Sequence, residues 1–208
     1  MIKALVFDMG GVLIRLNGQR CVDAFKKKAG FDDIEDYLDL FHQKGFIGEF
    51  EKGTINEDEF YRRCLEHCRP GTTPDVLEEC LDEILVDVNP SAVSLIKECE
   101  GKYPMYVLSN NNPISLRCFE KMLVQAGIPM DKVFKEIFFS FRMKVLKPSR
   151  EIYERMIAAI GLPPEEILFI DDSEKNVTGA EAVGLKTLHY RPDGDLRTQV
   201  EILLSGRY

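Results

Sequence analysis

Residues 4–13 read Ala-Leu-Val-Phe-Asp-Met-Gly-Gly-Val-Leu, an unbroken apolar run followed by the carboxylate of Asp8 and then by two glycines. Consecutive apolar residues without alternation predict a short strand that is covered on both faces, as in a parallel sheet. Glycine permits a tight turn and a close approach of the backbone to a ligand. This stretch therefore predicts a buried first strand with a chemically active group at its carboxyl end.

Further apolar runs along the chain predict more buried strands of the same kind. They are Tyr106–Leu108, Ile167–Ile170 and Thr187–His189, with Ile137–Phe139 as a weaker candidate. Helix-length patterns separate them, and some begin with a capping residue before a proline, as in Asn112-Pro113. Alternating strands and helices are typical of a doubly wound domain, so we expect a three-layer, Rossmann-like α/β core with a parallel sheet.

Residues 16–88 differ from the rest of the chain, because they contain no convincing strand. Helical patterns are found around residues 21–29, 34–41, 57–68 and 76–85, with glycines and Pro70-Gly71 between them. Helices joined by short loops predict a small bundle. We therefore expect an all-helical cap at residues 16–88, inserted after the first strand into an α/β core made of residues 1–15 and 89–208.

Composition excludes several classes of protein. The chain has 208 residues, of which 45% are hydrophobic, and a net charge of −8. An excess of acids, 35 against 27 bases, argues against a nucleic-acid partner. No apolar stretch reaches the roughly 18 residues of a membrane span, and the N-terminal run lacks the apolar core and small-residue cleavage site of a signal peptide. Six cysteines without CxxC spacing argue against a zinc site and favour free thiols. We expect a cytoplasmic protein, either monomer or dimer.

Polar residues gather after the predicted strands. Because the carboxyl ends of parallel strands meet at one edge of a sheet, these side chains should lie together. Three carboxylates suit a Mg²⁺ ion, and a lysine and a helix N-terminus at Pro113 suit a phosphate, which indicates a small phosphorylated metabolite as partner. A carboxylate can also act as a nucleophile and form an aspartyl-phosphate. The set comprises Asp8, Ser109, Asn110, Lys147 (or its neighbour Lys144), Asp171 and Asp172.

The order of these segments resembles the four motifs of the haloacid dehalogenase-like (HAD) superfamily, whose members are mostly phosphatases. The matching segments are Phe7–Leu13, Leu108–Asn110, Lys147-Pro148 and Phe169–Asp172 with Asn176, so the resemblance spans residues 1 to about 190. The helical insert resembles the cap of subfamily I.

The resemblance assigns a function to each site residue. It implies that Asp8 is the nucleophile and a magnesium ligand, and that Ser109, Asn110 and Lys147 bind the phosphate. Further magnesium ligands would be Asp172, the main-chain carbonyl of Gly10, and Asp171, which would bind directly or through water.

Gly10 departs from the usual family motif, which has a second aspartate at that position to donate and accept a proton. In this respect the chain resembles the α-glucose-1-phosphatase-like branch, which has an Asp-x-Gly first motif. Such an acid–base group contributes about 10²–10⁴-fold to rate. Three interpretations are open: the enzyme works without the group, another residue replaces it from the cap, or the protein is weakly active and serves binding or regulation. Without a proton donor, we expect a preference for esters with a less basic leaving oxygen.

A metal-independent 2-haloacid dehalogenase is a further alternative. Those relatives share the nucleophile and the lysine but lack paired aspartates in the fourth motif, so Asp171 and Asp172 favour the phosphatase. Residues that recognise the substrate are expected on or beside the cap, where position alone suggests Arg15, Asn17, Phe46 and Glu49.

Overall fold

A five-stranded parallel sheet forms the centre of the computed structural model, which describes residues 1–38, 44–192 and 194–204. The strand order is β5-β4-β1-β6-β7, and β1 pairs with both β4 and β6. The bounds are Ala4–Phe7 for β1, Met105–Ser109 for β4, Glu136–Phe139 for β5, Ile167–Asp171 for β6 and Lys186–His189 for β7. Every predicted strand is confirmed within a residue at each end, and so is the α/β fold class.

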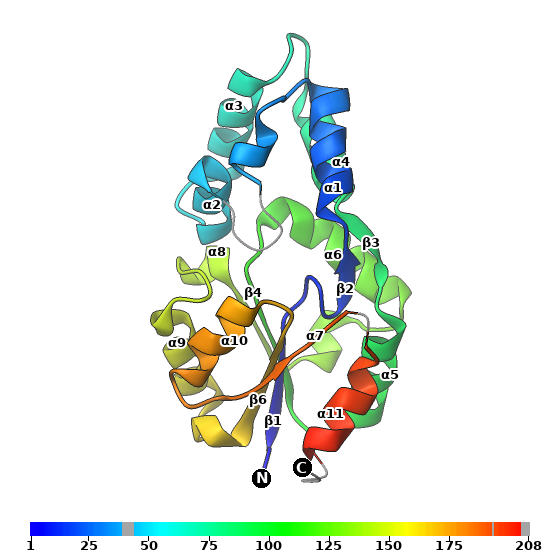
Figure 1. Ribbon diagram of the computed structural model, residues 1–208, viewed down its shortest axis with the longest axis vertical. Coiled ribbons are helices and arrows are strands. Elements are labelled where there is room, and N and C mark those ends of the chain that lie inside the picture. The colour runs from blue at the N-terminus through cyan, green and yellow to red at the C-terminus, as the bar shows by residue number, and fades with distance from the viewer. Residues whose placement is uncertain (39–43, 193, 205–208) are drawn as a thin grey trace.

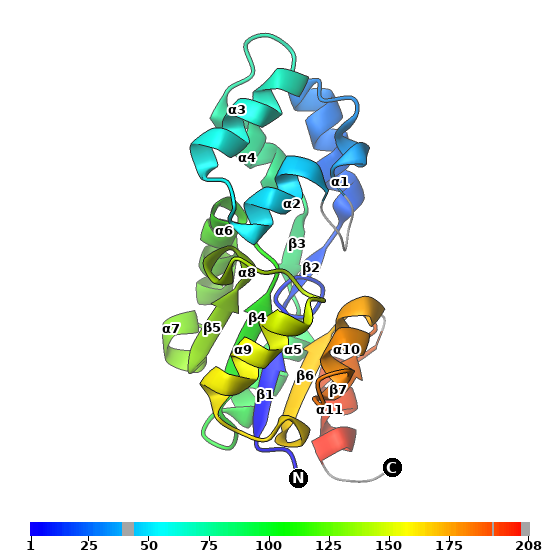
Figure 2. The ribbon, with the colours of Figure 1, turned by 90° about the vertical axis from the view of Figure 1, so that its left-hand side faces the viewer.

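Helices cover both faces of the sheet, as Figures 1 and 2 show. Successive residues of β1 point to opposite faces: Leu5 and Phe7 pack into one apolar cluster, and Ala4 and Val6 into another. Since all four are fully buried, their unbroken apolar sequence is explained. The first cluster includes α5 (Pro90–Cys99), α6 (Pro113–Gln125) and α11 (Leu196–Leu204), and the second includes α9 (Arg150–Ile160) and α10 (Glu174–Glu181). Short helical turns complete the core: α7 (Met130–Val133), α8 (Ser140–Met143) and η3 (Pro164–Glu166).

The remaining helices form a separate bundle, called the cap below, at the end of the molecule away from both termini (Figure 1). Phe25, Phe31, Phe50 and Phe60 are fully buried in its own apolar cluster. The elements are α1 (Gly18–Ala24), the π-helical η1 (Phe25–Ala29), the 3₁₀ turn η2 (Ile34–Asp36), α2 (Gly45–Lys52), α3 (Glu57–His67) and α4 (Pro74–Asp82).

The structure corrects the expectation of an insert without strands. β2 (Ile14–Leu16) and β3 (Leu85–Val88) pair antiparallel where the chain enters and leaves the cap. The two crossings lie side by side, so their backbone groups pair with each other, which the sequence of either segment alone does not reveal.

Two helix predictions in the cap also need correction. The pattern at residues 34–41 yields only η2, and residues 39–41 lie outside the described residues. The sequence predicts no helix at residues 45–52, because Gly45 and Gly48 are typical of breaks, yet α2 forms there and burial of Phe46, Ile47 and Phe50 stabilises it. Within the described ranges, no helix is long and apolar enough to cross a membrane.

Candidate active site

The predicted site residues meet at the carboxyl edge of the sheet, beside a cavity of about 330 Å³. Asp8 directly follows β1, Ser109 is the last residue of β4, and Asp171 is the last residue of β6. The predicted residues that line the cavity are Asp8, Gly10, Ser109, Asn110, Lys147 and Asp172. Asp171 lies beneath them with a fully buried side chain.

Of the two lysines that the sequence suggests for the phosphate, Lys147 and not Lys144 lies in the site. Its buried ammonium group lies 3.0 Å from Asp8 Oδ1 and 2.6 Å from Asp171 Oδ2, and it donates a hydrogen bond to the carbonyl oxygen of Leu108. Burial lowers the pKa of Lys147, but attraction to the two carboxylates outweighs burial and raises it overall. The alternative, Lys144, donates instead to the carbonyl oxygen of Gly53 in the cap.

Asn110 fixes the backbone of Lys147. Its Oδ1 accepts a hydrogen bond from the Lys147 N–H at 2.8 Å, and its Nδ2 donates to the Lys147 carbonyl oxygen at 3.0 Å. Both ends of the amide therefore bind the backbone of the lysine. Next to it, Asn112 caps α6 by accepting from the N–H of Ser115, as the Asn-Pro pattern predicted.

Three carboxylates crowd the same edge. Asp8, Asp171 and Asp172 each offer an oxygen, and these atoms lie within 4.8 Å of one another. Burial raises the pKa of Asp8 well above its usual range, Lys147 opposes the rise, and the two neighbouring aspartates add to it. Burial and the charge of Asp171 raise the pKa of Asp172 to about 6. Three ionised carboxylates and one ammonium leave a formal charge of −2, which a divalent cation would balance, and an all-oxygen set suits Mg²⁺.

Asp171 and Asp172 have different surroundings. The oxygens of Asp171 accept hydrogen bonds from Lys147, from the N–H of Ser173 at 2.8 Å and from Nδ2 of Asn176 at 3.1 Å. The Asp172 carboxylate instead lies over Gly11, where an added Cβ would be 1.9 Å from Oδ2. The φ of +78° at Gly11 also favours glycine. Asp172 is therefore better placed than Asp171 to offer oxygen to a cation.

Gly10 has a different reason for lacking a side chain. Its backbone is not in the left-handed region, so a side chain there would cause no backbone strain. A Cβ at this position would, however, lie 2.8 Å from Cδ1 of Leu16. Leu16 thus occupies the space in which the family's second aspartate would begin.

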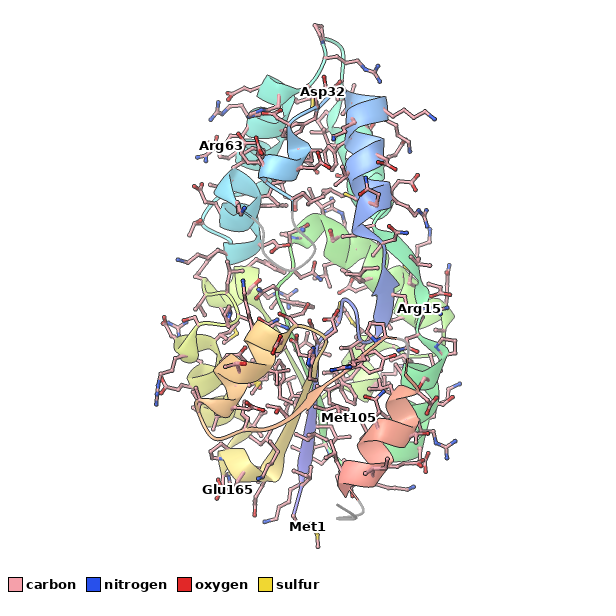
Figure 3. All side chains as sticks on the ribbon, in the orientation of Figure 1. Met1, Arg15, Asp32, Arg63, Met105 and Glu165 are labelled. Atoms are coloured by element: carbon pink, nitrogen blue, oxygen red, sulfur yellow. The ribbon has the colours of Figure 1, made fainter. Side chains whose placement is uncertain are left out.

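The cap side of the cavity differs from the expectation. Arg15 lines the cavity, but the other three suggested substrate-recognition residues do not: Asn17 caps α1, Phe46 is buried inside the cap, and Glu49 pairs with Arg63. Figure 3 shows Arg15 on β2, between the sheet and the cap, and Arg63 among the cap helices. Glu51, which the sequence did not indicate, lines the cavity from α2. The sequence does not predict this position, because the glycines around Glu51 argue against the helix that carries it.

A family model described as haloacid dehalogenase-like hydrolase matches residues 2–184. The chain belongs to this family. The resemblance drawn from the four motifs is thereby confirmed, and the protein is a HAD-like hydrolase.

Several known proteins match nearly the whole chain. A D-ribitol-5-phosphate phosphatase of Bacteroides thetaiotaomicron is 29% identical over 99% of this chain and 100% of its own. A solved aspartate-to-alanine variant of a HAD family enzyme of that organism, in complex with magnesium and inorganic phosphate, is 30% identical to this chain with a TM-score of 0.90, and the match covers 96% of this chain and 99% of the other. An L-2-haloacid dehalogenase of Xanthobacter autotrophicus, at 20% identity, TM-score 0.59 and coverage of 99% and 84%, shares the fold alone.

Proposed function

We propose that this HAD-like hydrolase is a magnesium-dependent phosphatase that cleaves small phosphate esters through an aspartyl-phosphate on Asp8. The observation that carries the proposal is the cluster of Asp8, Lys147, Asp171 and Asp172 at the edge of one cavity. Support also comes from the relative named as a D-ribitol-5-phosphate phosphatase and from the solved relative with magnesium and phosphate.

Asp8 is the proposed nucleophile. Its Oδ1 accepts a hydrogen bond from the Met9 N–H at 2.6 Å and forms an ion pair with the Lys147 ammonium group at 3.0 Å. These bonds orient the group and leave Oδ2 to attack phosphorus. Lys147 contributes positive charge for the equatorial phosphate oxygens, and Ser109 and the N-terminus of α6 contribute donors. Asn110 positions Lys147 by binding its backbone.

Asp8, Asp172 and the carbonyl oxygen of Gly10 are the proposed magnesium ligands, with Asp171 beside them. When bound, magnesium would neutralise the excess negative charge of the site and favour the ionised form of Asp8. Asp171 contributes by fixing Lys147, because its carboxylate lies 2.6 Å from the ammonium group.

A sugar or polyol phosphate is the substrate class that we propose. The cavity is small and combines Arg15, Glu51 and Ser115 with apolar walls from Leu16 and Phe119. The leaving oxygen of a polyol phosphate is a basic alkoxide, and the named substrate of the Bacteroides relative is of this kind. This proposal differs from the preference for a less basic leaving oxygen that the absence of an aspartate at Gly10 predicts. A basic alkoxide needs a proton as it leaves, so the proposal requires a proton donor in the site.

The domain division and the location are also proposals. Residues 1–15 and 89–208 would form the catalytic core and residues 16–88 the cap, with the β2–β3 ribbon at the junction. The six free cysteines are consistent with a reducing compartment such as the cytoplasm.

The proposal is tested by measuring phosphate release from a panel of phosphate esters with and without magnesium. We expect turnover that a chelator removes and that Asp8→Asn abolishes. Halide release from 2-haloacids in the presence of chelator, without phosphate release from any ester, would instead establish the dehalogenase.

A further inference from the structure

A carboxylic acid from the cap shares the cavity with the proposed nucleophile. Glu51, on α2, lines the same cavity as Asp8, Ser109 and Lys147. It lies outside the cluster of three aspartates that we propose for magnesium and comes from the cap rather than the core. The inference below rests on the proposed phosphatase function and concerns the proton that leaves with the alcohol.

The contacts around Glu51 fix this part of the cap to the core. The hydroxyl of Ser140, on α8, donates to the carbonyl oxygen of Glu51 at 2.6 Å. Two residues later, Gly53 ends α2 with a φ of +72°, and a Cβ there would lie 2.2 Å from the carbonyl oxygen of Phe141. Lys144 donates to the carbonyl oxygen of Gly53. Both ribbon views show α2 beside α8, so Glu51 is placed by direct backbone contact between cap and core (Figures 1 and 2).

The surroundings of Glu51 favour a protonated carboxyl group. Burial raises the pKa of Glu51 to about 8, and the positive charge of Lys147 opposes this rise. Helices α3 and α8 pack against α2, and the arginines on these two helices have other partners. Arg63 pairs with Glu49 and Glu59, and the Arg142 guanidinium lies over the rings of Phe139 and Phe141. A carboxyl group with such a pKa is largely protonated at neutral pH and can donate a proton.

We propose that Glu51 is the general acid and base of the reaction, in place of the aspartate that is missing at residue 10. As Asp8 attacks phosphorus and the ester P–O bond breaks, the Glu51 carboxyl gives its proton to the leaving oxygen, and an alcohol departs. The Glu51 carboxylate then takes a proton from water, whose oxygen attacks the phosphorus of the aspartyl-phosphate. Asp8 is released as a carboxylate, hydrogen phosphate departs, and Glu51 is protonated again.

The test compares Glu51→Gln with Glu49→Gln on two esters, a primary alkyl phosphate and 4-nitrophenyl phosphate. We expect Glu51→Gln to lower kcat on the alkyl ester by about 10²–10⁴-fold, the usual contribution of an acid–base group. Nitrophenolate needs no proton to leave, so its release should begin with a burst of one equivalent per enzyme and then slow, because the base for the second step is missing. Glu49→Gln, on the same helix but exposed and paired with Arg63, should stay within about twofold of the wild type.

A pH profile provides a second readout. For the wild type acting on the alkyl ester, kcat/KM should fall above about pH 8, as Glu51 loses its proton. That basic limb should be absent in Glu51→Gln and present in Glu51→Asp, which keeps the carboxyl group. Release of nitrophenolate by Glu51→Gln without a burst, together with an unchanged basic limb on the alkyl ester, would overturn the proposal. Magnesium-dependent turnover that Asp8→Asn abolishes would leave the phosphatase function standing in that case.

Discussion

Replacing Lys147 with methionine removes the ammonium group that separates the buried Asp8 and Asp171 carboxylates. At separations of 3.0 Å and 2.6 Å and an effective dielectric constant of about 20, each ion pair contributes about 5–6 kcal/mol of attraction. Desolvation of the lysine offsets part of this, and removing one partner of a buried pair usually costs about 3–5 kcal/mol. We therefore expect the free energy of unfolding of Lys147→Met to fall by about 3–5 kcal/mol in urea titrations of the metal-free protein at pH 7.5.

The loss should shrink toward pH 5. Burial and the neighbouring carboxylates already raise the pKa of Asp8, and the variant lacks the lysine that opposes this rise. As the pH falls, Asp8 of the variant therefore takes up a proton, and its repulsion with Asp171 disappears. The matched control is Lys144→Met, whose ammonium group binds only the Gly53 carbonyl oxygen among the contacts that the described residues supply, and it should lose about 1 kcal/mol or less. A loss below about 1 kcal/mol for Lys147→Met, or a loss that grows as the pH falls, would refute the reasoning.

Three further perturbations test other parts of the account. Gly11→Ala should abolish magnesium-dependent turnover and lower the thermal unfolding midpoint, because its Cβ would lie 1.9 Å from Asp172 Oδ2; a variant with wild-type kinetics would contradict the contact. Gly53→Ala should raise KM and lower kcat, because its Cβ would collide with the Phe141 carbonyl oxygen. The control is Gly71→Ala, which has a φ of +89° and open space around the Cβ, so it should lose only about 1 kcal/mol of stability and keep wild-type kinetics. Equal kinetics for the two variants would count against the contact between α2 and the core. Asp172→Asn should weaken magnesium binding by roughly tenfold or more in calorimetry. Because the pKa of Asp172 is raised to about 6, its ionised form opposes folding, so metal-free Asp172→Asn should gain up to about 3 kcal/mol over the wild type between about pH 4 and 6, and an unchanged difference across that range would exclude this.

The core was predictable because its signals are local. The three central strands, β1, β4 and β6, are buried along their whole length, so their apolar runs are almost unbroken. Asp8 directly follows the first of them, and Ser109 and Asp171 are the last residues of the other two. Parallel strands bring these ends to one edge, which places Asp8 beside Lys147 and Asp171 although they are far apart in the chain. The functions assigned to these residues stay predictions until they are measured.

The cap was less predictable because its signals depend on packing. The β2–β3 ribbon forms only because two crossings of the chain lie side by side. Helix α2 forms in spite of its glycines because Phe46 and Phe50 are buried. For this reason the sequence does not predict that Glu51 lines the cavity or that the side chain of Leu16 fills the space beside Gly10. Both facts come from contacts between cap and core, which no single stretch of sequence contains.

The measurement that tests the central claim most directly is a search for the covalent intermediate. The enzyme is mixed with magnesium and a polyol phosphate, quenched in acid within the first turnover, and digested for peptide mass spectrometry. A phosphoryl group on Asp8, absent without magnesium and absent in Asp8→Asn, is the predicted result. Full turnover by wild-type enzyme with no phosphoryl group on Asp8 at any quench time, or undiminished turnover by Asp8→Asn, would contradict the account.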